Sequence, residues 1–282
     1  MTSLMRSAIS SVPPLPRTGV DSHAHLDMPH FGTDLPAVLS RAAAAGLANI
    51  GNVFLGLGAW EQGKGLFADA PEVFFLLGIH PTDAMSCSPE TLAGMKDAFA
   101  SDIRLRALGE IGLDFYWKTC PPDIQRSVFR AQLHLARALS LPVVIHSRDA
   151  YAATLAILRN ENFTGRPLLW HCFGGNAEQA KELAGLGWHI SIPGSVTFPA
   201  NHALRDAVRG IPPDKLLVET DCPYLAPMPH RGKRNEPAYA AITAACIADI
   251  LGMDAAELWT RCGDNARRFF GIEEISLNRS SL

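Results

Sequence analysis

The sequence predicts a single (β/α)8 TIM-type barrel, and three observations lead to that prediction. Short runs rich in Val, Ile and Leu alternate with segments of helical periodicity, and eight of these runs are strand candidates. Runs of this kind are typical of parallel strands that are buried on both faces. The length of 282 residues suits eight βα units, because such barrels usually take about 250 residues. No Gly-x-Gly-x-x-Gly turn follows an early strand, so a dinucleotide-binding sheet has little support.

The strand candidates are short apolar runs, and most of them end where chemically reactive side chains begin. We expect the first strand to begin at the short apolar lead-in 19–20 and to continue through the two histidines that follow. The other seven strands are expected, in order, at residues 49–57, 73–79, 105–111, 141–145, 168–170, 189–192 and 216–218. No linker divides this series. The chain therefore predicts one barrel domain over 19–271, with a flexible N-terminal arm over 1–18 and a C-terminal tail over 272–282.

The helix candidates combine a periodic apolar stripe with a capping or stop residue. Gly46 is a suitable stop for the first helix, while Ser88 and Pro89 suit the cap and the first turn of the third. The helices are expected at 34–46, 60–69, 89–99, 122–140, 150–160, 177–186, 201–210, 237–251 and 254–270. The segment 122–140 has the best stripe, and its apolar face is expected at Ile124, Val128, Ala131, Leu135 and Ala138.

Composition excludes several classes of protein. A formal net charge of −3 gives no global attraction to nucleic acid, so polyanion binding would need metal ions or local basic residues. Six scattered cysteines without a Cys-x-x-Cys pair argue against a disulfide scaffold or zinc ribbon. No apolar run approaches the roughly 20 residues of a membrane span, and residues 1–18 lack the apolar core of a signal peptide. We therefore expect a cytoplasmic protein without a membrane segment.

Residues of the types that bind metals follow five of the predicted strands. His23 and His25 share one face of the first strand, because side chains two residues apart in a strand point to the same side. The fourth, fifth, sixth and eighth strands end in Glu110, His146, His171 and Asp221. A lone histidine after an apolar run is usually a packing or capping residue. In a barrel, however, the C-terminal strand ends meet at one rim, so this shared placement favours a common site.

Six ligands exceed what one tetrahedral ion takes, and they suit two divalent ions about 3.5–4 Å apart. Imidazole favours zinc, while carboxylates also admit manganese or magnesium. Such a pair suits the hydrolysis of a phosphodiester, with Glu110 as bridge and Asp221 as the candidate to orient the attacking water or take its proton. We assign one ion to His23, His25, Glu110 and Asp221, and the other to Glu110, His146 and His171.

Four neighbouring residues are candidates for substrate binding. Arg148 lies two residues past a ligand and could bind a phosphate, with an ion pair to Asp149 as the alternative. Arg231 and Lys233 belong to a dense basic cluster after the eighth strand, where barrel phosphate sites often lie, although solvated surface is the alternative. His80 ends the third strand and could contact substrate or a ligand, or simply order its loop.

Other residues near the rim have structural interpretations beside functional ones. Tyr116 and Trp117 could stack on a base, or they could pack. Glu219 could orient ligand histidines. Cys172 and Cys222 each follow a proposed ligand, and strand alternation would point both away from the site as packing residues. Asp27 and Asp114 are expected to order loops rather than to act as catalysts.

Several stretches together carry a specific family resemblance. They are DSHAHLD at 21–27, GIHP at 78–81, GEIGLDFY at 109–116, LPVVIHSRDA at 141–150, HCF at 171–173, ETDCPYL at 219–225 and PHRGKRNEP at 229–237. With them, the chain resembles the TatD family of metal-dependent hydrolases, which is related to the amidohydrolase superfamily, over about residues 19–271. One departure is Gly174, where the family usually has Ser. Glu110 in the fourth-strand place disfavours the branch that uses a carboxylated lysine.

The resemblance implies a TIM-type barrel and a divalent-metal deoxyribonuclease, which in this family is often a 3′-to-5′ exonuclease on single strands. It also implies the same six ligands, each at a matching position. We therefore expect a monomeric enzyme that acts on nucleic acid, either DNA ends or RNA. Two rivals stay open. One is an ester or amide hydrolase such as a D-aminoacyl-tRNA deacylase, because the same ions would polarise a carbonyl. The other is a non-catalytic barrel that binds protein at its rim, which an intact ligand set argues against.

Overall fold

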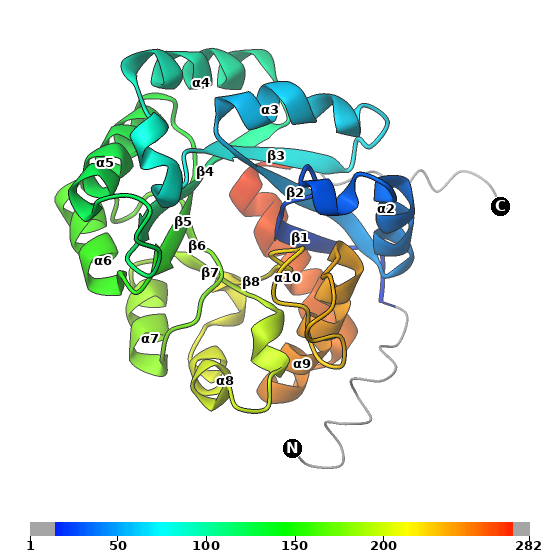
Figure 1. The fold of residues 1–282 in the computed structure, drawn as a ribbon. Helices are drawn as coiled ribbons and strands as arrows, with labels where there is room; N and C mark the ends of the chain where they lie inside the picture. Colours follow the sequence, from blue (N-terminus) through cyan, green and yellow to red (C-terminus); the bar gives the residue numbers. More distant parts are fainter. Residues whose placement is uncertain (1–14, 273–282) are drawn as a thin grey trace.

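A computed structural model describes residues 15–272, and it shows eight parallel strands arranged as a barrel inside a ring of helices (Figure 1). Each strand pairs with the next in chain order, and a bridge between Ala24 and Cys222 brings the last strand back to the first. The predicted single-domain (β/α)8 architecture is confirmed. The strands are β1 Gly19–Ala24, β2 Leu47–Leu55, β3 Val73–Gly78, β4 Leu105–Asp114, β5 Val143–Arg148, β6 Leu168–Trp170, β7 His189–Ile192 and β8 Leu216–Val218.

The helices follow the predicted order with small shifts at their ends. The α-helices are α2 Leu35–Ala44, α3 Leu57–Gly63, α4 Pro89–Ser101, α5 Pro122–Ala138, α6 Tyr151–Asn160, α7 Ala177–Gly185, α8 His202–Arg209, α9 Ala240–Leu251 and α10 Ala255–Phe270. Short 3-10 helices are η1 Pro29–Phe31, η2 Lys64–Phe67, η3 Pro81–Ser86, η4 Gly194–Thr197, η5 Pro213–Lys215 and η6 Pro237–Tyr239. The helix expected at 60–69 instead begins at Leu57 and changes to a 3-10 turn at Lys64, so β2 ends two residues earlier than expected.

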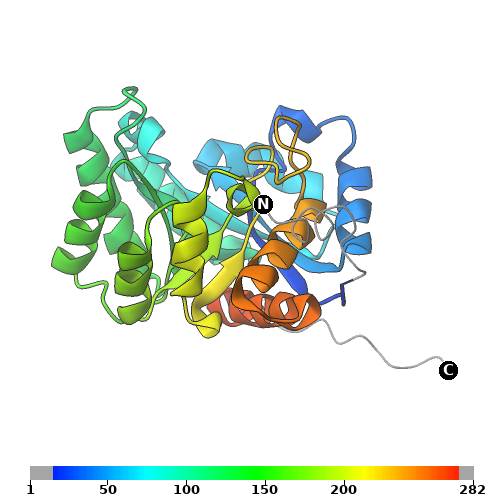
Figure 2. The ribbon, with the colours of Figure 1, turned by 90° about the horizontal axis from the view of Figure 1, so that it is seen from below.

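The barrel has a packed apolar interior that α10 closes at one end. Val20, Leu76 and Leu217 point into this interior and pack with Ala266 and Phe270 of α10. In Figure 2 this helix lies across the bottom of the barrel, at the N-terminal ends of the strands. A second and larger apolar layer fills the space between the strands and the surrounding helices. α10 therefore covers the end of the barrel that lies opposite the C-terminal rim.

The buried face of α5 differs from the predicted apolar stripe. Ile124 is 37% exposed, whereas Gln125 and Gln132 are each 1% exposed and lie against the barrel. The reason is hydrogen bonding, because Gln132 both accepts from the Ile79 N–H (2.7 Å) and donates to the Ile79 carbonyl (3.0 Å). Gln125 makes the same pair of bonds with the backbone of Asp114. The predicted stripe is therefore wrong at Ile124, whereas Val128 and Leu135 do pack against the core as predicted.

The first described residues pack against α10. The Trp259 indole donates to the Pro16 carbonyl (3.0 Å), and Arg267 donates to the carbonyl of Thr18 (2.8 Å). The rest of the predicted arm, residues 1–14, and the predicted tail from 273 onward lie outside the described residues.

No single helix within residues 15–272 is long and apolar enough to cross a membrane. The adjoining helices Pro237–Leu251 and Ala255–Phe270, bent by 111°, reach the required length and hydropathy only together.

Candidate metal centre

The six predicted ligands converge at the C-terminal rim of the barrel. Backbone hydrogen bonds join the ends of β1 and β8 there, because Asp221 donates to the His23 carbonyl and His25 donates to the Cys222 carbonyl, each at 2.9 Å. This pairing places the two histidines of the first strand beside the carboxylate that follows the last strand. His23 is fully buried and His25 is 3% exposed.

Glu110 lies at the centre of the group and presents its two oxygens to different histidines. Its Oε1 atom is 3.8 Å from His23 Nε2 and 3.7 Å from His25 Nε2. Its Oε2 atom is 2.7 Å from His171 Nε2 and 3.2 Å from His146 Nδ1. A carboxylate arranged in this way has the geometry of a bridge between two ligand sets.

Asp221 completes the half of the site that faces Glu110 Oε1. Its Oδ1 atom is 3.5 Å from His25 Nε2 and 3.9 Å from His23 Nε2. His23 also stacks on His171, with ring centroids 3.9 Å apart, so it lies between the two halves. By the distances between ligand atoms, His23 groups with Glu110 and His171 and equally with His25 and Asp221. The Glu110 oxygen that faces His23 is Oε1, which also faces His25, and this contact places His23 in the half with His25 and Asp221. We prefer the division by Glu110 oxygens, because each oxygen then belongs to the half whose imidazole nitrogens it faces.

The donor set fits a divalent metal. Both ring nitrogens of His23 and both of His171 are buried, and none makes a hydrogen bond of normal geometry with any residue from 15 to 272. A buried polar atom without a partner costs about 1–3 kcal/mol. The ring nitrogens of His23, which lie no closer than 3.8 Å to a carboxylate oxygen of the site, are therefore the clearest indication of a missing ligand. Imidazole nitrogens beside carboxylate oxygens are donors suited to zinc and also to manganese.

The electrostatics of the cluster favour ionised carboxylates. Burial acts to raise the pKa of Glu110, but the positive His171 and hydrogen bonds from His146 outweigh it, and the pKa lies well below its usual range. Burial likewise opposes ionisation of Asp221, yet His25 and the other imidazoles lower its pKa. Burial acts to lower the pKa of His171, and the charges of Glu110 and Glu219 overcome it and raise that pKa well above normal. Cations are thus favoured among these carboxylates.

Two carboxylates that are not predicted ligands contact two of the ligand histidines. His146 donates from Nε2 to Asp114 Oδ2 (3.0 Å), which leaves its Nδ1 atom directed at Glu110. Glu219 is fully buried, and its Oε2 atom lies 3.6 Å from His171 Nδ1. Such partners fix the orientation of imidazole ligands in metal sites. Glu219 lies where the sequence predicted, but the contact of Asp114 with His146 was missed. The strand period could have revealed it, since residues 110 and 114 have the same parity in β4.

Cys172 corrects one prediction. It was expected to point away from the site, but its Sγ atom lies 3.8 Å from Asp221 Oδ2. The reason is its backbone, which has φ = 47°, so strand alternation does not apply there. Cys222 is fully buried in the apolar core, in agreement with its predicted packing role.

Two of the four predicted substrate residues lie beside His146. His80 has its ring 4.4 Å from the His146 ring, in an edge-to-face arrangement, and forms a compact set with Asp114 and His146. Arg148 is exposed, and its guanidinium lies over the Tyr116 ring rather than in an ion pair with Asp149.

The other two candidates lie in the basic loop after β8. Arg231 stacks over Phe198 at 4.5 Å, and Lys233 is exposed. Arg234 of the same loop pairs with Asp34 through two hydrogen bonds of 2.8 and 2.7 Å, which ties the loop to the start of α2 and neutralises part of its charge. Neither Arg231 nor Lys233 makes a hydrogen bond or ion pair with a predicted metal ligand in the part of the chain that is described.

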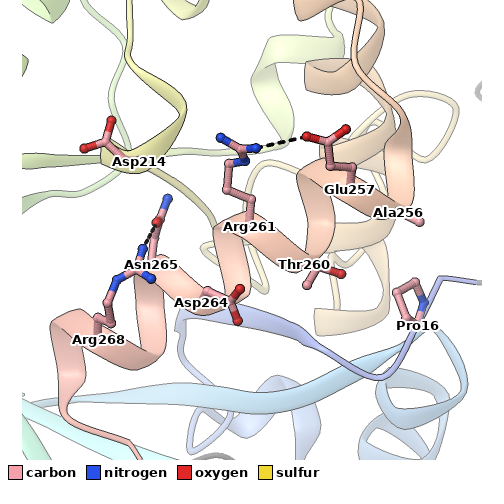
Figure 3. A pocket seen from close by; sticks show the side chains of 9 residues that line it. All are labelled: Pro16, Asp214, Ala256, Glu257, Thr260, Arg261, Asp264, Asn265 and Arg268. Carbon is pink, nitrogen blue, oxygen red and sulfur yellow. Dashed lines mark hydrogen bonds and ion pairs between the residues drawn. The ribbon is translucent and has the colours of Figure 1, made fainter.

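A surface depression of about 630 Å³ lies away from this rim, beside η5 and α10 (Figure 3). It contains none of the predicted ligands. Several of its charged groups already have partners, since Arg261 pairs with Glu257 and Arg268 donates to Asn265. Its lining consists of Pro16, Asp214, Ala256, Glu257, Thr260, Arg261, Asp264, Asn265 and Arg268.

Comparisons with known proteins agree with the fold. A family model described as TatD related DNase matches residues 20–271. A Bacillus subtilis (strain 168) protein, named uncharacterized metal-dependent hydrolase YabD, is 38% identical over 252 residues, which are 89% of this chain and 98% of that protein. An Enterobacter lignolyticus (strain SCF1) protein, named 3′-5′ ssDNA/RNA exonuclease TatD, is 36% identical over 259 residues, which are 89% of this chain and 98% of that protein. The crystal structure of YJJV, a TatD homologue from Escherichia coli K12, matches with a TM-score of 0.85 at 28% identity and covers 91% of this chain and 99% of that one.

Proposed function

The chain belongs to the TatD-related DNase family of metal-dependent hydrolases, and on that premise we propose that it cleaves phosphodiester bonds of DNA as a 3′-to-5′ exonuclease on single strands. The observation that carries the proposal is the placement of Glu110, whose two oxygens face different imidazoles. A relative that covers nearly the same length is named a 3′-5′ ssDNA/RNA exonuclease, which supports a nucleic acid as substrate.

In this proposal two divalent ions are held by residues of the rim. His23, His25, Glu110 and Asp221 would hold one ion, and Glu110, His146 and His171 the other. When bound, such a pair lowers the pKa of water to near neutrality and stabilises negative charge on phosphate oxygens. Zinc, manganese and magnesium are all candidates, because the set mixes imidazole with carboxylate.

The protein groups have separate tasks in the proposed reaction. Asp221 orients the attacking water and takes its proton, since its side chain is 15% exposed whereas that of Glu110 is 5% exposed. Glu110 holds both halves of the site at a fixed separation. The Arg148 guanidinium donates hydrogen bonds to a phosphate oxygen of the substrate near His146. Arg231 and Lys233 add positive charge in the loop after β8.

The deciding experiment is digestion of single strands labelled at either the 5′ or the 3′ end. Purified protein would be stripped with a chelator and then given zinc, manganese or magnesium. We expect a ladder of shortened 5′-labelled strands, early release of the 3′ label, and no cleavage with the chelator. Hydrolysis of a D-aminoacyl-tRNA or a simple ester by the metal-loaded protein, with every DNA and RNA strand left intact, would overturn the proposal in favour of carbonyl chemistry.

A further inference from the structure

The segment that follows β4 exposes two neighbouring aromatic rings. Tyr116 is 50% exposed and Trp117 is 52% exposed, and their ring centroids are 5.0 Å apart at 88°. The other four tryptophans of the chain all lie within the described residues and are at most 6% exposed. Packing was one of the two sequence-based interpretations of this pair. Half-exposed rings have apolar surface left over for a ligand.

Positive charge surrounds this aromatic pair. The Arg148 guanidinium lies 3.8 Å from the Tyr116 ring centroid and 5.8 Å from that of Trp117. Within residues 15–272 no carboxylate lies at ion-pair distance from that guanidinium. The exposed ammonium of Lys118 lies on the same loop and donates to the backbone carbonyl of Phe115. Aromatic faces interleaved with cations are the combination that binds single-stranded nucleic acid.

Asp114 fixes this surface relative to the metal centre. Its Oδ1 atom accepts from the backbone N–H groups of Tyr116 (3.0 Å) and Trp117 (2.9 Å), while its Oδ2 atom accepts from His146. Arg148 pairs in register with Asp114 across β4 and β5, two positions beyond the pairing of His146 with Gly112. One buried carboxylate thus connects the aromatic pair to a predicted metal ligand.

We propose that Tyr116, Trp117 and Arg148 form a stacking platform for an unpaired nucleotide base beside the metal centre. The proposal rests on the proposed nuclease function and specifies which part of the substrate the rim recognises. A base presents a flat face to the rings, and Arg148 meets the adjoining phosphate. The faces of bases inside a duplex are covered by their neighbours, so the platform selects single strands.

Binding without turnover tests the platform independently of catalysis. In chelator, a short thymidine oligonucleotide should quench Trp117 emission and protect it from iodide, and the four buried tryptophans provide a constant background. An oligonucleotide of equal length with abasic residues should bind about five- to a hundredfold more weakly, in line with the loss of one stacked base. Equal binding of the two strands would overturn the proposal, whether or not the protein proves to be a nuclease.

Kinetics of the metal-loaded enzyme provide the second test. Tyr116→Ala and Trp117→Ala should raise KM for single strands by about five- to a hundredfold, with little change for abasic strands, while Tyr116→Phe and Trp117→Phe keep most of the affinity. Ile103→Ala is the matched control, because Ile103 is 80% exposed and precedes β4 at the opposite end of the barrel. Unchanged KM values in an active, folded enzyme would disprove the platform and leave the nuclease proposal intact. Lack of nuclease activity combined with base-dependent quenching would disprove the nuclease proposal and leave the platform intact.

Discussion

Glu110 is the residue on which the candidate metal centre depends, because its two oxygens face the imidazole nitrogens of different halves. Each of its oxygens faces a different group of imidazole nitrogens at 2.7 to 3.8 Å. Removing any other predicted ligand would weaken one half of the site. Removing this carboxylate would leave each half without one oxygen donor, and the two halves without their connection.

We therefore predict that Glu110→Gln lowers both metal content and DNA cleavage by more than about a hundredfold. Loss of a group that only orients a ligand typically costs 10- to 100-fold, and a shared ligand should cost more. Elemental analysis and end-labelled cleavage would measure the two effects. The control is Glu257→Gln on α10, since Glu257 has a side chain 56% exposed and paired with Arg261. A Glu110→Gln protein that retained two ions and full activity would show that this carboxylate is not a bridge.

His189 shows a different effect of burial, at a position far from the ligands. Burial and the nearby charges of Lys215 and Arg268 lower its pKa from 6.5 to about 4, although Asp214 partly opposes them. Its ring packs against Phe269 at 5.4 Å. Because the folded-state pKa lies below the unfolded one, the protonated ring destabilises the native state. The contribution to stability is intact above pH 6.5 and is lost as the pH falls toward 4.

We predict that His189→Gln makes the unfolding free energy less sensitive to acid between pH 6.5 and 4. The full shift corresponds to roughly 3 kcal/mol, and about 1–2 kcal/mol is expected after allowing for partial solvent screening of the ring. Urea unfolding at pH 7 and pH 4.5, with chelator present for both proteins, would measure the difference. Parallel pH profiles for the two proteins would refute this account of His189.

At the scale of elements, α5 positions the ends of two strands. Gln132 occupies both backbone groups of Ile79, next to His80, and Gln125 occupies both backbone groups of Asp114. Each amide accepts from a backbone N–H and donates to a backbone carbonyl, as a residue of a neighbouring strand would. The glutamines thereby satisfy these groups at the ends of β3 and β4. The helix is therefore part of the support for the rim as well as part of the outer ring.

We predict that Gln132→Ala destabilises the protein by about 2–4 kcal/mol, because it leaves a buried N–H and a buried carbonyl of Ile79 without partners. Ile124→Ala on the same helix should cost at most about 1 kcal/mol, since Ile124 is 37% exposed. Denaturant unfolding of the chelated proteins would compare them. A larger loss at Ile124 would favour the face that the sequence predicted over the face that the structure shows.

The contrast on α5 explains how far the sequence can predict this fold. Short apolar runs revealed all eight strands, because burial on both faces leaves a strong local pattern. The buried positions of Gln125 and Gln132 were not predicted, because their partners Asp114 and Ile79 lie outside the helix. Hydrophobic periodicity within the helix contains no information about such partners. The orientation of Cys172 was missed for a similar reason, because its positive φ is invisible in composition. Strand ends thus predicted where the candidate ligands converge, whereas hydrogen bonds from side chains to the backbone, which fix those strand ends, left no pattern in the sequence.

At the scale of the whole molecule, the two ends of the barrel have opposite characters. The N-terminal end is closed by α10 with apolar contacts, and the preceding Pro16 and Thr18 carbonyls are held by Trp259 and Arg267. The C-terminal end collects buried imidazoles and carboxylates. His23 lies in β1, His25 directly follows that strand and Asp221 follows β8, so the cluster lies across the junction that closes the barrel.

This placement leads to the last prediction, that divalent ions stabilise the entire fold. The ligands are dispersed over some 200 residues of chain, so the unfolded state offers no comparable site and binding contributes to folding. At a hundredfold excess over Kd, each ion should add about 2.7 kcal/mol to the free energy of unfolding. Thermal and urea unfolding with manganese or zinc against chelator would measure it, and Glu110→Gln should abolish most of the gain. Ions that support cleavage yet leave the unfolding transition of the unmodified protein unchanged would mean that these ligands do not hold the metal across the β1–β8 junction.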